Sequence, residues 1–266
     1  MEEVKSGIPI FSLLKPKTII KTYVKEVVCV KNPGHRKYKA TMNLCDDGIE
    51  YQENECPLCE QELENAKKEQ QKEELIQHYK DCNIEPEYYG KTLKDYETKT
   101  PTQEDTLKAA EAILNHKLGK LILLGTHGVG KSMIASILAN EMNGKIYTMY
   151  EISTMIRQSY TARSDKSELE IVNELASIPF LAIDEVGRTN GSNSELNWLS
   201  YILDKRHVRK LPFMLITNGH LRKNCPNGGC NECFENYMDS DVISRLRQNS
   251  KVINIVADDY RARKQF

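Results

Sequence analysis

The residues best suited to chemistry lie at positions 125–132, which read Gly-Thr-His-Gly-Val-Gly-Lys-Ser. In this G-x-x-x-x-G-K-S spacing, glycines let backbone N–H groups approach phosphate oxygens closely. We expect the Lys131 ammonium to reach the β- and γ-phosphates and the Ser132 hydroxyl to ligate Mg²⁺. An apolar run precedes the loop and a segment with helical spacing follows it, which favours a nucleotide site over a chance glycine-rich turn. The predicted binding residues are Gly125, Thr126, His127, Gly128, Val129, Gly130, Lys131 and Ser132.

Two acids, Asp184 and Glu185, end a second apolar run. In a phosphate-loop protein the first acid would hold Mg²⁺ and the second would polarise the attacking water. By themselves they fit better an ordinary strand that ends in solvated carboxylates. The phosphate loop lies upstream at a distance that suits neighbouring parallel strands, so we favour the metal-binding interpretation.

Asn218 and Arg245 are the remaining candidates for catalysis. Asn218 follows the next apolar run, at residues 213–216, where a polar side chain can reach the γ-phosphate or hold the attacking water. Without the upstream motifs it would be interpreted as a turn residue. Arg245 can stabilise charge on a transferring phosphoryl group, and such an arginine can come from a neighbouring subunit. The alternative for Arg245 is a surface arginine of a helix.

The elements that must position these side chains alternate along residues 105–266. Apolar runs and amphipathic segments in alternation predict an α/β domain with a parallel sheet and crossover helices. Besides the strand before the phosphate loop, we expect strands at 145–150, 178–183, 213–216 and 252–256. We expect helices at 106–116, 133–142, 151–160, 167–176 and 195–206.

Cysteine spacing near the N-terminus predicts a zinc site. Cys56 and Cys59 form a C-x-x-C pair, and Cys29 and His35 precede it. Four nitrogen and sulfur ligands suit tetrahedral Zn²⁺, so we expect these four residues to bind zinc in a zinc-ribbon-like module, with Cys45 as a substitute ligand. Free thiols with a chance C-x-x-C are the alternative.

A second possible zinc set lies in a glycine-containing insertion between Asn218 and Arg245. Its members are His220, Cys225, Cys230 and Cys233. A loop of this kind can fold around a metal without a core of its own. A flexible loop with free thiols is equally consistent with the spacing.

Composition excludes some classes of function. The 266 residues carry 37 basic and 38 acidic side chains, for a net charge of −1, so nucleic-acid binding would need a local patch. No apolar run approaches a membrane span and the first residues carry no signal-peptide core, so we expect a cytoplasmic protein with no membrane partner. In that compartment the eight cysteines suit metal ligation or free thiols better than disulfides.

Composition also divides the chain. The tract at 60–80 is rich in Glu, Gln and Lys with almost no apolar face, which predicts a solvated helix, with a disordered spacer as the alternative. We predict a zinc-binding domain at 1–62, a charged helical linker at 63–82 and an ATPase domain at 83–266.

The combined motifs resemble the DnaC/IstB group of AAA+ ATPases. The match extends over about residues 83–266, and the combination is more specific than any single motif. It rests on the phosphate loop, Ile183-Asp184-Glu185 and Asn218, together with Ser244-Arg245-Leu246, the helix pattern from Leu199 to Arg206 followed by Pro212, the segment from Asn83 to Tyr96, and the ending Asp259-Tyr260-Arg261-x-Arg263.

This resemblance implies an AAA+ P-loop NTPase core, a parallel sheet flanked by helices, without the usual C-terminal lid because few residues follow Arg245. It implies an ATPase that uses ATP and Mg²⁺, self-associates, and applies Arg245 to the ATP of the adjacent subunit. It further implies a DnaC-type loader that delivers a replicative hexameric DNA helicase onto single-stranded DNA, with the N-terminal zinc module docking the helicase. In the family, the segment 151–176 would face the DNA, and the residues that could contact it are Arg157, Tyr160, Arg163 and Lys166. The alternative is that these residues form a solvated helix face and loop.

Two other functions stay open at this stage. An IstB-like helper ATPase of DNA transposition has nearly the same core. An adaptor with a relic ATPase core is a third possibility, which the intact Lys131, Asp184, Glu185 and Arg245 disfavour.

Overall fold

The computed structural model describes residues 18–161, 164–187, 193–225, 229–230, 233–238, 240–260 and 262. The chain forms two compact units, Met1–Glu74 and Leu75–Phe266. Among the described residues, no helix is both long enough and apolar enough to cross a membrane.

The first unit is built on a small antiparallel sheet. Its strands are β1 (Ile19–Val27), β2 (Tyr38–Cys45) and β3 (Glu50–Gln52), in the order β1-β2-β3. Its buried apolar side chains, within the described part of this unit, are Cys29, Ala40, Cys45 and Cys56. A core this small gives little hydrophobic stabilisation, and modules of this size usually depend on a metal or disulfides.

Helix α1 (Pro57–Asp81) occupies the charged tract, where the sequence predicts a helix. Of its 25 residues only Tyr79 is buried. The helix is therefore solvated along most of its length, as the lack of an apolar face predicts.

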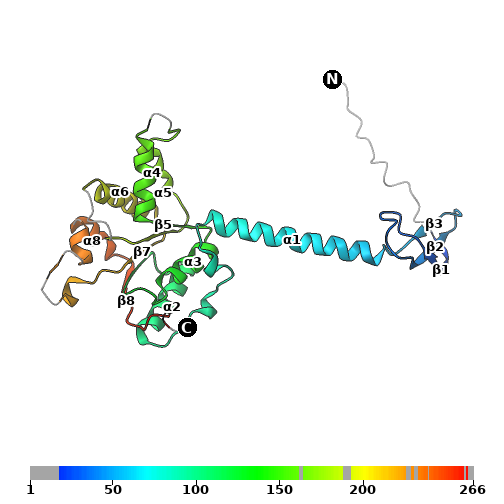
Figure 1. Cartoon of the computed structure of the whole chain (residues 1–266), viewed down its shortest axis with the longest axis horizontal. Helices are drawn as coiled ribbons and strands as arrows, with labels where there is room; N and C mark the ends of the chain where they lie inside the picture. The colour runs from blue at the N-terminus through cyan, green and yellow to red at the C-terminus, as the bar shows by residue number, and fades with distance from the viewer. Residues whose placement is uncertain are drawn as a thin grey trace, which may run out of the picture. The chain divides into compact units, whose positions relative to one another are not determined.

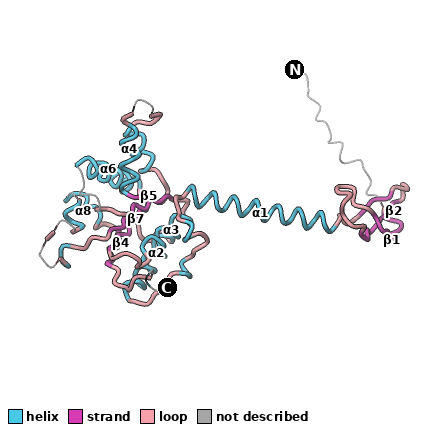
Figure 2. Tube along the Cα trace, viewed as in Figure 1, coloured by secondary structure: helices cyan, strands magenta, loops and turns pink. Residues whose placement is uncertain are grey.

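The second unit contains a five-stranded sheet in the order β5-β6-β7-β4-β8, and all neighbouring strands are parallel. Strands run through the middle of this unit with helices around them (Figure 2). The strands are β4 (Lys120–Leu124), β5 (Lys145–Thr148), β6 (Leu181–Asp184), β7 (Phe213–Thr217) and β8 (Ser250–Asn254).

Helices cover both faces of this sheet (Figure 1). Along β4, Leu121 and Leu123 pack with α2 and α3, whereas Ile122 and Leu124 pack with the helices of the other face. This alternation is the period of a strand whose two faces are both buried. One face carries α2 (Pro101–Leu114) and α3 (Lys131–Glu141); the other carries α4 (Met149–Ser159), α5 (Glu168–Leu175), α6 (Asn193–Arg209) and α8 (Ser240–Leu246).

Short helical turns complete the second unit. Three are 3-10 helices: η2 (Pro86–Tyr88), η3 (Leu93–Asp95) and η4 (Arg222–Asn224). The fourth is α7 (Phe234–Tyr237), which precedes α8.

Two details of the predicted fold are wrong. The strand expected at 145–150 ends at Thr148, because the Thr148 side chain and Glu151 form a capping box that starts α4 at Met149. The strands that carry the phosphate loop and Asp184 are not neighbours, since β7 lies between β4 and β6.

Candidate nucleotide and metal sites

The phosphate loop joins β4 to α3, and its backbone requires glycine at two places. Gly125 has φ +137°, and a Cβ there would lie 2.6 Å from the carbonyl oxygen of Ile255. Gly130 has φ +95°, and its Cβ would lie 2.8 Å from a ring carbon of Tyr96. A larger residue at either position would displace the neighbouring β8 extension or the tyrosine ring. The loop can therefore present bare backbone to a phosphate group.

Lys131 is the first residue of α3 and its side chain is buried against the loop. Its Nζ donates hydrogen bonds to the carbonyl oxygens of Gly125 (2.6 Å) and Thr126 (2.7 Å). It also donates to Asn218 Oδ1, at 2.9 Å. The structure thus brings the phosphate-loop cation and the amide after β7 together, although the two residues are 87 positions apart.

The next residue, Ser132, contacts Asp184. Its Oγ donates to Asp184 Oδ2 at 3.1 Å. The contact forms although β7 separates the two strands, because α3 packs across the face of the sheet over β6 and β7. A hydroxyl beside a carboxylate is a set of hard oxygen donors of the kind that Mg²⁺ prefers. These two side chains therefore fit a magnesium ion that accompanies a bound nucleotide.

Burial raises the pKa of the Asp184 carboxyl. Hydrogen bonds from the backbone N–H of Glu185 and from the Ser132 hydroxyl act in the opposite direction, as does the charge of Lys131. A divalent cation would favour the ionised form more strongly than these groups do.

Glu185 follows Asp184 in the left-handed backbone region, with φ +58°. Few residues with a Cβ adopt this conformation. Two hydrogen bonds hold the turn: the Glu185 N–H donates to Asp184 Oδ1 (2.6 Å), and the Val186 N–H donates to the carbonyl of Ile216 on β7 (2.9 Å). The turn places the Glu185 carboxylate in the lining of the same cavity as the phosphate loop.

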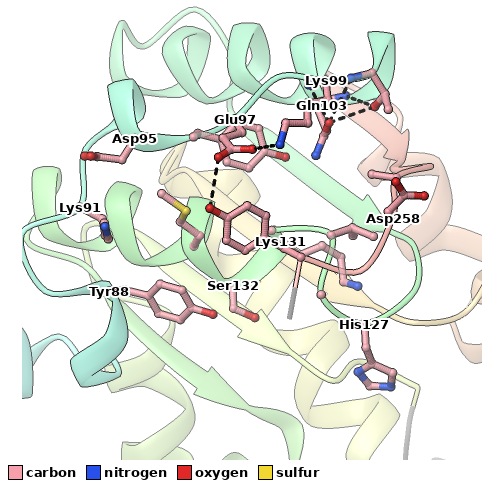
Figure 3. A pocket seen from close by; sticks show the side chains of 18 of the residues that line it. Tyr88, Lys91, Asp95, Glu97, Lys99, Gln103, His127, Lys131, Ser132 and Asp258 are labelled. Atoms are coloured by element: carbon pink, nitrogen blue, oxygen red, sulfur yellow. Dashed lines mark hydrogen bonds and ion pairs between the residues drawn. The ribbon is translucent and has the colours of Figure 1, made fainter. Parts of the chain in front are cut away.

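The cavity over the loop measures about 910 Å³, a size that suits a small-molecule ligand. Besides the predicted residues, it is lined by side chains that the motifs did not identify (Figure 3). The segment containing Tyr88 and Lys91 entered the sequence argument only through resemblance, and no pattern marked Lys99, Gln103 or Asp258. These positions come from loops whose proximity to the site depends on the tertiary fold.

The segment after β8 forms one wall of the cavity. The Ile255 N–H donates to the carbonyl of Leu124 (2.8 Å), and the Tyr260 N–H donates to the carbonyl of Gly128 (2.9 Å). The Tyr260 hydroxyl donates to Glu97 Oε1 (3.2 Å). The chain thus passes along the phosphate loop, where a Cβ on Gly128 would collide with the Asp259 carboxylate.

Arg245 lies on α8 outside this cavity, and it is half exposed. Its guanidinium is paired with Asp204 of α6, which raises the pKa of the arginine through a hydrogen bond and the opposite charge. Lys120 holds the end of the helix, since its Nζ donates to the carbonyls of Arg245 (2.6 Å) and Gln248 (2.8 Å). Within one chain, Arg245 therefore contacts Asp204 and is not among the residues that line the nucleotide cavity.

The residues considered for DNA contact are paired within the second unit. Arg157 lies 3.4 Å from Glu195 Oε1, Lys166 lies 2.5 Å from Glu174 Oε2, and the Tyr160 hydroxyl donates to Glu168. Arg163 and the terminal Arg261 and Arg263 lie outside the described residues. Arg157, Tyr160 and Lys166 keep solvent-exposed side chains that a phosphate or a base can reach.

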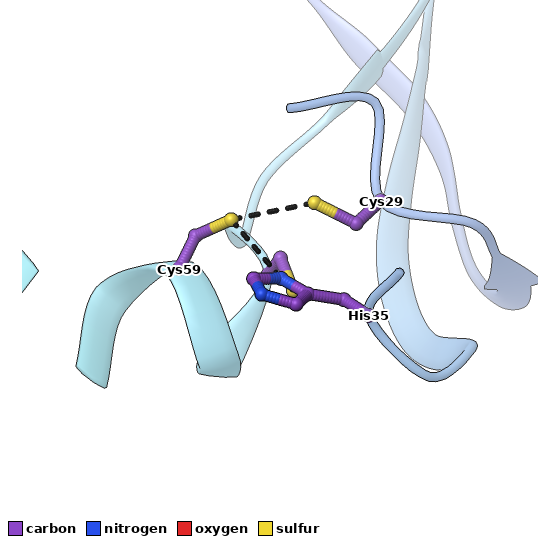
Figure 4. Close-up of side chains that lie close together, drawn as sticks. Cys29, His35 and Cys59 are labelled. Carbon is purple, nitrogen blue, oxygen red and sulfur yellow. Dashed lines mark hydrogen bonds between the residues drawn. The ribbon is translucent and has the colours of Figure 1, made fainter. Parts of the chain in front are cut away.

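The predicted N-terminal zinc ligands form one cluster, and their ligand atoms all lie within 4.8 Å of one another: Cys29, His35, Cys56 and Cys59. His35 Nδ1 is 3.6 Å from Cys56 Sγ and 3.4 Å from Cys59 Sγ, and the Cys29 and Cys59 sulfurs are 3.3 Å apart (Figure 4). Cys45 is buried in β2 and is not a member of this cluster.

A residue that the sequence argument missed supports this cluster. His35 directs Nδ1 toward the sulfurs, while its Nε2 is 3.0 Å from Glu62 Oε1. A carboxylate on the far nitrogen is the usual means of orienting a metal-binding imidazole. The Asn32 N–H also donates to Cys29 Sγ at 3.3 Å. The donor set fits Zn²⁺, and a metal would supply stabilisation that the small core of the first unit lacks.

The second set also converges. Ligand atoms of His220, Cys225, Cys230 and Cys233 all lie within 4.8 Å of one another. This group follows β7, two residues beyond Asn218.

Comparison with known proteins gives this arrangement a context. A family model described as an IstB-like ATP binding protein matches residues 59–266. The replicative helicase loader DnaC of Escherichia coli (strain K12) is 25% identical over 189 residues, which cover 68% of this chain and 73% of that protein. The replicative helicase loader DnaI of Bacillus subtilis (strain 168) is 25% identical over 192 residues, covering 68% of this chain and 58% of that protein.

Solved structures share the fold of the second unit. A crystal structure of the DnaC helicase loader superposes with a TM-score of 0.52 at 17% identity, covering 65% of this chain and 100% of that one. AMPPCP-bound DnaA from Aquifex aeolicus gives a TM-score of 0.53 at 15% identity, over 67% of this chain and 53% of that chain. The fold is that of an AAA+ P-loop NTPase core, as the resemblance implied.

Proposed function

Because this chain belongs to the family of IstB-like ATP-binding proteins and is an ATPase of that family, we propose that it is an ATP-switched loader of a replicative hexameric DNA helicase. It acts as an oligomer and delivers the helicase onto single-stranded DNA in the cytoplasm. The helicase as partner is supported by relatives that are themselves named replicative helicase loaders. The switch is supported by the geometry of the nucleotide site.

The main support for an ATP-dependent switch is a pair of contacts made by two consecutive residues of α3. Lys131 donates to Asn218, and Ser132 donates to Asp184. A single bound nucleotide would therefore contact residues at the carboxyl ends of β4, β6 and β7. We assign the β- and γ-phosphates to Lys131, Mg²⁺ to Ser132 and Asp184, and the attacking water to Glu185 and Asn218.

Arg245 completes this assignment from a neighbouring subunit. Within its own chain it is paired with Asp204 and half exposed, so it is available to a partner that docks on this side of α8. A cation added to the transferring phosphoryl group from another subunit couples hydrolysis to assembly. ATP binding would then favour the oligomer, and hydrolysis would release it.

The remaining assignments concern the chain before the ATPase core. We propose that residues 1–62 form a zinc module that docks the helicase, that 63–82 act as the linker, and that 83–266 form the ATPase domain. The Cys29, His35, Cys56 and Cys59 cluster supports the zinc. The division of the chain into compact units at Glu74 and Leu75 falls inside the proposed linker.

The test is association with the replicative helicase of the same genome. We would mix the full chain and the hexameric helicase and separate complexes by size with ATP, with ADP and without nucleotide. The expected result is a complex whose amount or stability depends on the nucleotide, and Lys131→Ala removes that dependence. Absence of a complex in all three states would overturn the loader assignment. A complex with a DNA transposase in its place would favour the IstB-like helper.

A further inference from the structure

The insertion between β7 and α8 contains a group of side chains that the nucleotide site does not use. We propose that His220, Cys225, Cys230 and Cys233 bind a second structural Zn²⁺, separate from the N-terminal one. The inference is independent of the helicase, because it concerns only the metal content of this chain.

Distances within the group match those of a tetrahedral zinc site. With Zn–S bonds of about 2.3 Å and Zn–N bonds of about 2.0–2.1 Å, a tetrahedron separates two sulfurs by about 3.8 Å, and a sulfur from a nitrogen by about 3.6 Å. The Cys230 and Cys233 sulfurs are 3.9 Å apart. His220 Nε2 is 3.3 Å from Cys230 Sγ and 3.5 Å from Cys233 Sγ.

The backbone holds the ligands in this arrangement. His220 and Cys233 are paired in an isolated parallel β-bridge, and the Phe234 N–H donates to the carbonyl of His220 at 2.9 Å. The Cys230 N–H donates to Cys233 Sγ at 3.3 Å. These contacts fix the positions of His220, Cys230 and Cys233 relative to one another.

The insertion also needs a source of stability. Among the described residues from 218 to 233, Cys233 is the one buried side chain. Fixing a residue costs about 1–2 kcal/mol of backbone entropy, and apolar burial among these described residues does not offset that cost. Four protein ligands around one ion close the coordination sphere, which is the composition of a structural zinc site.

The position of the proposed zinc site indicates which parts of the second unit the ion would hold together. His220 lies two residues after Asn218, and Cys233 directly precedes Phe234. Phe234, Val242 and Leu246 pack in the core beside α6. The ion would connect the segment that follows β7, which contains Asn218, to the segment that leads into α8, which contains Arg245.

The first experiment counts metal. Native mass spectrometry of the full chain, purified with zinc and without chelator, is expected to show two Zn²⁺ per chain. Cys230→Ser and Cys56→Ser should each retain one, and the double variant none. Cys45→Ser, which removes a buried thiol outside both clusters, should retain two. A wild-type chain with one zinc that is lost in Cys56→Ser would overturn the second site.

A second measurement keeps the proposal testable if the variants do not fold. Wild-type protein would be digested with trypsin and alkylated with iodoacetamide before and after zinc is removed with a chelator. We expect at least a tenfold faster cleavage after the exposed Arg222 and Lys223, and new alkylation of Cys225 and Cys230, once zinc is gone. Equal cleavage and labelling in both states would contradict the proposal, as would a Cys230–Cys233 disulfide in the purified protein.

Discussion

Lys131 is the side chain whose removal tests the nucleotide site most directly. Its Nζ contacts two loop carbonyls and Asn218, and it is the cation that we assign to the β- and γ-phosphates. In Lys131→Ala we expect ATP affinity to fall by about 100-fold or more, since charge-assisted hydrogen bonds contribute about 1.5–3 kcal/mol each. Titration with a fluorescent ATP analogue measures this.

The control for this variant is another lysine of the same unit. Lys108 is exposed on α2 beside Glu104 and is not among the residues that line the cavity, so Lys108→Ala should leave ATP affinity unchanged. If both variants bind ATP as the wild type does, Lys131 does not contact the phosphates.

Arg245 should separate binding from hydrolysis. In Arg245→Ala we expect ATP affinity to be retained, because the residue is not among those that line the cavity of its own chain. DNA-stimulated hydrolysis should fall by about 10³-fold, the lower end of the effect of an arginine supplied by a neighbouring subunit. Steady-state phosphate release with single-stranded DNA measures this.

Asp204→Asn distinguishes that role from a structural one. The exposed Arg245–Asp204 pair contributes little to stability, because solvent screens it. If Arg245 mattered only through this pair, both variants would lose activity alike. We expect Asp204→Asn to keep its hydrolysis rate while Arg245→Ala loses it.

At the scale of elements, the apolar patterns predicted the five strands of the second unit and its helices α2 to α6, because the central strands β4, β6 and β7 are buried and these helices pack apolar side chains against the sheet. They did not predict α7, α8 or the short 3-10 helices. The ends of helices and strands depend on capping residues, which the apolar pattern does not show. The capping box of Thr148 and Glu151 ends β5 at Thr148, two residues before the predicted end of that strand. Strand order was the larger error. Nothing in the apolar runs shows that β7 lies between β4 and β6, because order depends on how the crossover helices pack and not on any one segment.

The candidate sites divide in the same way. Glycines, a lysine, paired acids and C-x-x-C spacing follow from local chemistry, so those residues could be named from the sequence. Glu62, Glu97 and Lys120 act through contacts with distant segments. No local pattern distinguishes them from other charged or aromatic surface residues.

Arg206 shows how one buried side chain connects several elements. It is fully buried on α6, and its guanidinium donates to carbonyls at the end of α5 and before β6 and β7: those of Leu175, Ile178, Pro179 and Pro212. A lysine ammonium cannot reproduce this planar set of donors. We expect Arg206→Lys to lower the free energy of unfolding by about 2–4 kcal/mol, measured by urea denaturation. Arg209→Lys, at an exposed position of the same helix, should change it by less than about 0.5 kcal/mol.

At the scale of the whole molecule, we expect each of the two units to unfold without unfolding the other. Residues that line the nucleotide cavity all lie between Glu87 and Tyr260, within the second unit. That unit has cores on both faces of its sheet, whereas the first unit has few buried apolar residues. Loss of the N-terminal metal should therefore unfold the first unit and leave the ATPase intact.

Cys56→Ser tests this separation, because it removes one buried ligand of the N-terminal cluster. We expect one zinc fewer per chain and loss of the helicase complex, with ATP affinity and the thermal transition of the second unit unchanged. Zinc content, co-purification with the helicase and nucleotide titration would be measured on one preparation, beside Cys45→Ser. Retained helicase binding without that zinc would show that docking lies elsewhere in the chain. A parallel loss of ATP affinity would show that the two units depend on each other for folding.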